Sequence, residues 1–266
     1  MSNLGNFLKR SYIYLILLLV YVPLAFGFVL SFNPASPKGE VETRLQPGSF
    51  TFEHFANLFD AGRDLTFANT VLLAAIVSFF VIVLSLLTSY TLYRQRNKSI
   101  KRFVQSSSGI PLINPDNITA IGLVLVFSAF FGILATDSEG FIRLIVAHTV
   151  MALPFGISLM LPRSEKFNNN LYEAAQDLGY SSLRAWFKTY FVYMIPSIVM
   201  VAVVTSVLSF DDFIITKTVS NTSTLGSKLY EGSFEPWALV LGSIVLVFTI
   251  IGNIVYTMVK AKRKVA

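Results

Sequence analysis

The sequence is poor in the residues on which disulfide-rich proteins and most enzymes depend. It contains no cysteine, so disulfides and thiolate metal sites are excluded, although this absence leaves the compartment open. Charged residues make up only 14% of the chain, below the quarter that is typical of soluble domains. The two histidines, His54 and His148, lie on different segments, and no glycine-rich phosphate loop is present. We therefore expect no catalytic site, no metal site and no bound cofactor in this chain.

Hydrophobic residues make up 54% of the sequence and form long runs without charge. About 20 apolar residues cross the ~30 Å hydrocarbon layer as a helix. Six runs are long enough, and they cover residues 11–37, 67–93, 117–136, 144–162, 189–210 and 236–259. The prediction is an all-α integral membrane protein of six transmembrane helices, with residues 1–266 forming a single domain.

The basic residues indicate an orientation for these spans. If the first run is an uncleaved anchor with the amino terminus inside, the carboxyl terminus returns to the cytoplasmic side. Fifteen of the 21 Lys and Arg residues then lie inside, which is the positive-inside bias of multi-pass membrane proteins. The net charge of +6 comes from clusters beside the membrane ends, where anionic headgroups attract them, so no nucleic-acid partner is implied.

The first outer loop contains aromatic residues at helical spacing, among them Phe52 and Phe55 beside His54. This pattern predicts a short helix, and we favour a packing role at the ends of the bundle over ligand contact.

One polar loop, about residues 163–188, carries an unusual pattern between the fourth and fifth runs. Residues 168–170 are asparagines, which can cap a helix over residues 171–178. Gly179 suits a left-handed helix end, and Ser181 or Ser182 can start a second helix that continues into the fifth run. Small side chains at Ala174 and Ala175 would let a partner surface approach closely. A connector with ordinary caps is the plainer interpretation.

This loop resembles the Glu-Ala-Ala loop, with Gly three residues later, of type I ABC importer permeases. The resemblance covers nearly the whole chain, although Val192 stands where the family often has a proline. It implies a bacterial cell-membrane location and three kinds of partner: a dimeric ATPase that uses ATP and magnesium, a second related permease, and an extracytoplasmic substrate-binding protein. It also implies that the coupling residues are Glu173, Ala174, Ala175, Asp177, Leu178 and Gly179.

Within that family, several segments resemble the spermidine/putrescine permease subunits. They are Ser31-Phe32-Asn33, Pro115-Asp116, His148 with Leu153-Pro154-Phe155, Leu208-Ser209-Phe210-Asp211-Asp212, and Leu229-Tyr230 followed by Glu235-Pro236. The resemblance implies a polyamine cargo.

The acidic residues near the span ends are consistent with a cationic cargo. Asp116 has apolar sequence on both sides, and we expect it well inside the membrane, where a carboxylate is either functional or caps a broken helix. An acidic, aromatic mouth would bind cations through Coulomb attraction and cation–π contact. Its predicted members are Asp211, Asp212, Tyr230, Glu231, Glu235 and Trp237. His148 is expected to be a packing partner between helices rather than a ligand.

Three alternatives stay open from the sequence alone. An importer of this family could carry iron, thiamine, phosphonates or sugars. An ATP-independent channel or secondary carrier would need internal repeats, which we do not find, and would leave the Glu-Ala-Ala loop without a role. A structural membrane anchor would require neither Asp116 nor prolines inside its spans.

Overall fold

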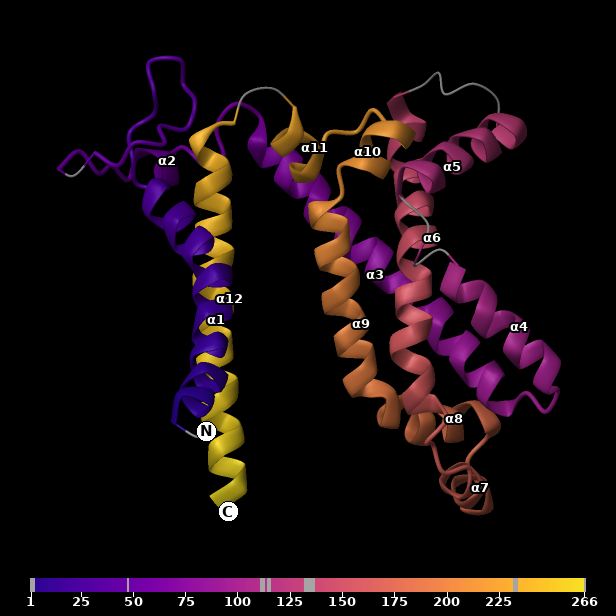
Figure 1. The fold of residues 1–266 in the computed structure, drawn as a ribbon. Helices are drawn as coiled ribbons and strands as arrows, with labels where there is room; N and C mark the ends of the chain where they lie inside the picture. Colours follow the sequence, from indigo (N-terminus) through magenta and orange to yellow (C-terminus); the bar gives the residue numbers. More distant parts are fainter. Residues whose placement is uncertain are drawn as a thin grey trace. The chain divides into compact units, whose positions relative to one another are not determined.

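The computed structural model describes residues 3–46, 48–110, 113, 116–131, 137–231 and 234–265. Within these ranges the regular structure is entirely helical (Figure 1). The helices divide between two compact units, Met1–Asp64 with Glu231–Ala266 and Leu65–Tyr230, which are described separately as unit 1 and unit 2. The prediction of a single domain stays a prediction.

Four helical segments of the described residues are long and apolar enough to cross a membrane. They are Arg63–Arg94, Gly140–Ser164, Ser182–Asp211 and Pro236–Val255. Two shorter apolar helical stretches, Tyr14–Leu30 and Asp116–Phe130, correspond to the first and third predicted runs. The multi-pass character is therefore confirmed, while the count of six spans and the side on which the termini lie stay predictions.

Unit 1 contains α1 (Asn3–Leu30), α2 (Glu53–Ala56) and α12 (Pro236–Val265). The predicted short helix of the first loop is α2, and its neighbours pack aromatic rings on the end of α1. Phe55 stacks on Phe32 with 4.9 Å between ring centroids, and His54 Nε2 lies 2.9 Å from the carbonyl oxygen of Asn33. These contacts support the packing role.

Unit 2 is built on three long helices, α3 (Arg63–Arg94), α6 (Asp137–Ser164) and α9 (Val192–Asp211). Serine and threonine hydroxyls join them inside the bundle. Ser78 Oγ on α3 lies 2.8 Å from Thr205 Oγ1 on α9, and Ser164 Oγ on α6 donates to the Ser89 carbonyl oxygen over 3.0 Å. Small side chains let the helix axes approach, and buried polar groups obtain partners that lipid would not supply.

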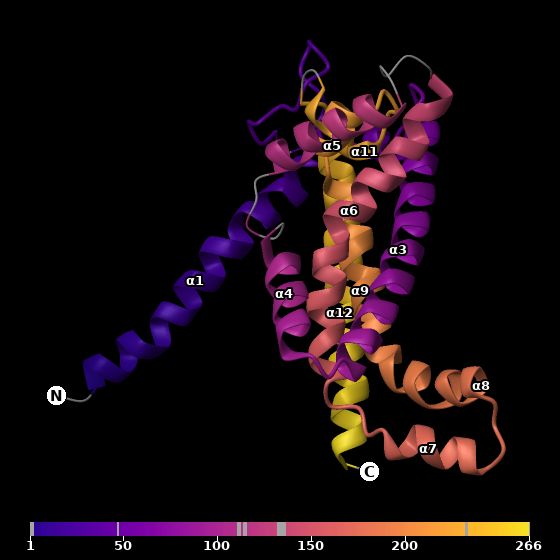
Figure 2. The ribbon, with the colours of Figure 1, turned by 90° about the vertical axis from the view of Figure 1, so that its right-hand side faces the viewer.

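The third predicted run, residues 117–136, corresponds to α5 (Asp116–Phe131) over its described part. A separate helix that was not predicted, α4 (Lys98–Gly109), precedes it, and its Lys101 forms a 2.6 Å ion pair with Glu165. Both views show α4 beside α6 and α5 running across one end of unit 2 (Figure 2). With 16 residues, α5 is about 24 Å long, shorter than the hydrocarbon layer.

The two ends of unit 2 carry different short helices. At one end lie α7 (Asn170–Asp177) and α8 (Ser182–Trp186), and α8 continues through the π-helix η2 (Phe187–Phe191) into α9. At the other end lie α10 (Ile214–Val219) and α11 (Leu225–Tyr230), with α5 packed on α10. The long helices therefore connect two chemically distinct ends.

Candidate functional sites: a helix–turn–helix and an acidic cavity

The predicted helix, break and helix around Gly179 are present. The helix α7 begins one residue after Asn169, whose Nδ2 donates to Glu173 Oε1 over 2.6 Å, and Asn168 Oδ1 accepts from the Asn170 N–H. Gly179 has φ = +86°, a conformation that costs other residues more than glycine, and no atom lies within 4 Å of the position where a Cβ would stand. Backbone conformation rather than space therefore selects glycine here.

Two features hold α7 and α8 in one arrangement. Gln176 Nε2 donates to Ser182 Oγ over 3.1 Å across the turn, and the Tyr180 N–H donates to the Ala175 carbonyl oxygen over 3.2 Å. The side chain of Ser181 makes no cap hydrogen bond, although Ser181 does precede α8 as predicted.

The alanines of this segment do not share one surface. Ala175 is buried within the chain, whereas Ala174 is exposed, as are Glu173, Asp177 and Leu178. Leu178 is 80% exposed, so its side chain makes little contact within the chain.

The second site is a cavity of about 310 Å³ at the opposite end of unit 2. Asp116 from the first residue of α5, Asp211 and Asp212 from the end of α9, and Tyr230 from the end of α11 all line it. Phe213 lines it too, with its ring stacked on Tyr230 at 4.8 Å. The cavity thus collects three carboxylates and two aromatic rings from segments far apart in the sequence.

The three aspartates are not equivalent. Asp212 is buried and fully engaged: its Oδ2 accepts from the N–H and the hydroxyl of Thr216, each over 2.8 Å, and lies 3.3 Å from His148 Nε2. Burial by itself raises the pKa of the Asp212 carboxyl, but the hydrogen bond and charge of His148 and the hydrogen bonds from Thr216 outweigh burial and lower it. Asp212 therefore fixes the joint between α9 and α10, with His148 as the expected packing partner.

Asp116 and Asp211 are exposed, and neither carboxylate has a hydrogen bond or ion pair with another described side chain. Asp116, the first residue of α5, lines the cavity together with the last turn of α9. Its predicted depth inside the membrane stays a prediction. Pro115, which precedes Asp116, lies outside the described residues.

The remaining predicted members of the acidic mouth belong to unit 1. Arg63 Nη1 lies 3.6 Å from Glu235 Oε2, and its guanidinium lies 5.7 Å from the centre of the Trp237 ring. The carboxylate of Glu235 is thereby partly compensated, and Glu231 also has a partner. That Glu231, Glu235 and Trp237 belong to the acidic mouth stays a prediction.

Phe213 and Met151, which line this cavity, and Thr216, which donates to Asp212, were not predicted from the sequence. The sequence did offer a signal for Thr216, because an Asp four residues before a Thr at the start of a short helix is typical of a helix cap. Phe213 and Met151 looked like ordinary apolar residues, and only the packing of α6 against α10 reveals their position.

Known proteins agree with this architecture. A spermidine/putrescine transport system permease protein PotC homolog of Mycoplasma pneumoniae is 30% identical in an alignment of 270 positions, which covers 99% of this chain and 94% of the relative. The chain belongs to the PotC family of ABC transporter permeases. The homolog of Mycoplasma genitalium is 29% identical over equal shares of both chains, and PotC of Escherichia coli is 27% identical over 93% of this chain and 89% of its own.

The fold of this PotC-family chain also occurs in a solved structure. A chain of a bacterial ABC transporter involved in the import of the acidic polysaccharide alginate matches with a TM-score of 0.57. The match covers 97% of this chain and 96% of the other, at 15% identity, so it supports the fold alone. No protein-family model matches the chain.

Proposed function

We propose that this chain is a transmembrane permease subunit of an ATP-driven importer of polyamines such as spermidine and putrescine. The observation that carries the proposal is one continuous helical segment, Ser182–Asp211, whose ends reach the two candidate sites. At about 1.5 Å per residue its 30 residues extend about 45 Å, so it can connect the turn at Gly179 with the acidic cavity.

The cavity suits a cargo with several ammonium groups. Each ammonium that leaves water needs acceptors, and Asp116 and Asp211 offer carboxylates that no described side chain occupies. The stacked rings of Phe213 and Tyr230 add a face for cation–π contact. The relatives named as spermidine/putrescine permeases support this cargo, whereas the cavity would repel an acidic polysaccharide or a phosphonate.

The partners would be an ATP-binding cassette dimer that uses ATP and magnesium, a second related permease and an extracytoplasmic binding protein. In this proposal Glu173, Asp177 and Leu178 contact the ATPase on the cytoplasmic side. Closure of the ATPase dimer would shift α7 and α8 together, because the turn and the Gln176–Ser182 hydrogen bond join them. The continuous helix would then carry that displacement to Asp211 and open the cavity to one side of the membrane at a time.

The cargo proposal is tested by uptake of labelled spermidine and putrescine into vesicles that contain the complete transporter. Asp116→Asn and Asp211→Asn should each lower uptake about two- to fivefold, since an exposed charge pair contributes up to ~1 kcal/mol. The double variant should lose about tenfold, equivalent to ~1.4 kcal/mol. Added salt should weaken the effect, because screening shortens the ~8 Å Debye length.

The matched control is Asp60→Asn, which removes an exposed carboxylate of unit 1 outside both sites. Normal spermidine uptake by the double variant would refute the acidic path, while the proposal of a polyamine importer would stand. Uptake that continues without ATP, or purification of the chain without an ATPase subunit, would favour the channel or carrier instead.

A further inference from the structure

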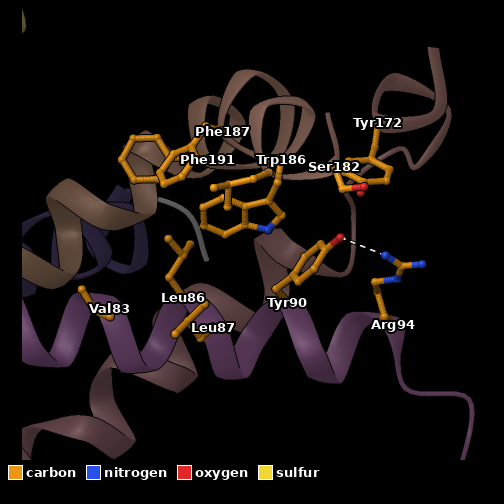
Figure 3. A pocket seen from close by; sticks show the side chains of 11 residues that line it. Val83, Leu86, Leu87, Tyr90, Arg94, Tyr172, Ser182, Trp186, Phe187 and Phe191 are labelled. Atoms are coloured by element: carbon orange, nitrogen blue, oxygen red, sulfur yellow. Dashed lines mark hydrogen bonds between the residues drawn. The ribbon is translucent and has the colours of Figure 1, made fainter. Parts of the chain in front are cut away.

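A second cavity of unit 2, of about 650 Å³, lies between α3 and the segment of α8 and η2. Figure 3 shows Val83, Leu86 and Leu87 of α3 on one side, with Phe187 and Phe191 facing them across the groove. These side chains are apolar, and the last two are aromatic. This end of the groove suits a hydrocarbon chain.

The other end of the groove is polar and positively charged. Arg94 Nη1 donates to Tyr90 Oη over 3.1 Å, and the guanidinium lies 5.8 Å from the centre of the Tyr90 ring and 5.9 Å from that of Tyr172. Arg94 is exposed, and no carboxylate among the described residues forms an ion pair with it. The guanidinium is therefore positioned by the two tyrosine rings, and its positive charge can bind an anion.

Arg184 on α8 and Lys188 on η2, the same segment that carries the groove residues Leu183, Trp186 and Phe187, are exposed but do not line the groove. Arg184 is held over the Tyr180 ring at 4.9 Å from its centre. Basic residues at a pocket between membrane helices are a recognised pattern for acidic lipid headgroups.

The length of the groove agrees with one leaflet of a bilayer. From Val83 to Arg94 the helix α3 rises about 16 Å at ~1.5 Å per residue, and half of the ~30 Å hydrocarbon layer is about 15 Å. A lipid chain inserted along α3 would thus end where the cationic group lies. A purely apolar protein segment would fill the groove but would give the charge of Arg94 no anionic partner.

We propose that this groove binds an anionic phospholipid, with one acyl chain between α3 and η2 and its phosphate at Arg94. Preference for an anionic over a zwitterionic lipid follows from the guanidinium of Arg94 at the polar end, where a choline group would be repelled. The bound lipid would lie against Tyr172 and Ser182, which belong to the two short helices around Gly179.

Trp186 lines the groove and provides the probe, because the chain has only two tryptophans. The full chain with Trp237→Phe is placed in phosphatidylcholine vesicles that contain a small fraction of dibrominated phosphatidylglycerol, and quenching of Trp186 is measured. Quenching should exceed that given by the same fraction of dibrominated phosphatidylcholine. Arg94→Gln should lower this preference about fivefold, which corresponds to ~1 kcal/mol per basic residue near the surface.

Lys166→Gln is the matched control, since it removes an exposed positive charge outside the groove and should leave the preference unchanged. Arg94→Lys should retain most of the preference. If Trp237→Phe does not fold, the difference between the native chain and Trp186→Phe gives the same signal.

Equal quenching by the two brominated lipids would overturn the proposal, because it would show ordinary contact with surrounding lipid. Absence of quenching by both would also overturn it, because protein would then cover the groove. A photoreactive phosphatidylglycerol should label the Val83 to Arg94 stretch in the assembled transporter as well. None of these measurements depends on the transported cargo, so failure here leaves the proposed function standing.

Discussion

At the scale of single residues, backbone conformation determines the residue at Gly179, whereas tertiary packing determines the different surroundings of Asp211 and Asp212. Gly179 is set by backbone conformation, which the sequence reveals because few other residues adopt positive φ. Asp211 and Asp212 are neighbours of the same chemical type, yet one is exposed at the cavity and the other is bonded to His148 and Thr216. That distinction depends on α10, whose packing the sequence does not show.

Substitutions at Gly179 should follow the ease with which each residue adopts positive φ. Because the space around the position is open, Gly179→Val should cost on the order of 1 kcal/mol or more through backbone strain, Gly179→Ala less, and Gly179→Asn least. ATP-dependent uptake should fall in that order while the amount of chain in the membrane stays constant. Equal uptake by the valine and asparagine variants would contradict a need for this turn geometry.

At the scale of elements, the contact between α3 and α6 depends on Gly156. A Cβ at this position would overlap Ser85 Oγ and lie 2.7 Å from Val81 Cγ1. Gly156→Ala should therefore push the two helices apart at a cost of about 1–3 kcal/mol, seen as a lower midpoint of thermal unfolding in detergent. Adding Ser85→Ala should restore part of the loss.

Gly122→Ala in α5 is the control, because no atom lies within 4 Å of its added methyl group and alanine favours a helix by roughly 0.5–1 kcal/mol. A midpoint for Gly156→Ala that equals the Gly122→Ala value would show that this helix contact adapts without cost.

Element by element, the sequence predicted the long helices better than their interruptions. The apolar runs of α3, α6, α9 and α12 reach about the length that a bilayer requires, so length alone identifies them. The helix α4 ahead of the third run was not predicted, and Pro111 and Pro115, which stand between α4 and α5 in the sequence, lie outside the described residues. Both α6 and α9 continue through internal prolines. A proline in the sequence therefore does not by itself predict whether a helix kinks or ends, because tertiary packing decides between the two.

At the scale of the whole molecule, the number of membrane crossings decides on which side of the membrane each site lies. In unit 2 the ends of α3 and α6 lie together, since Tyr93 Oη donates to the Phe167 carbonyl oxygen over 3.0 Å. The chain must therefore return to the opposite end of unit 2 between Arg94 and Asp137, which agrees with the predicted parity of six crossings.

Single cysteines can establish that parity, because the native chain has none and gives no background labelling. Cysteines at Ser99 and Ala261 should react with a membrane-impermeant maleimide only from the cytoplasmic side, and one at Ser49 only from outside. The physical basis is the positive-inside bias, which places Arg96 and Lys98 beside Ser99, and Lys260 and Lys262 beside Ala261, on the cytoplasmic face. Labelling of Ser99 from outside would place α7 and the turn at Gly179 on the wrong side for an ATPase. Labelling of Ser99 and Ala261 from opposite sides would show an odd number of crossings after α3.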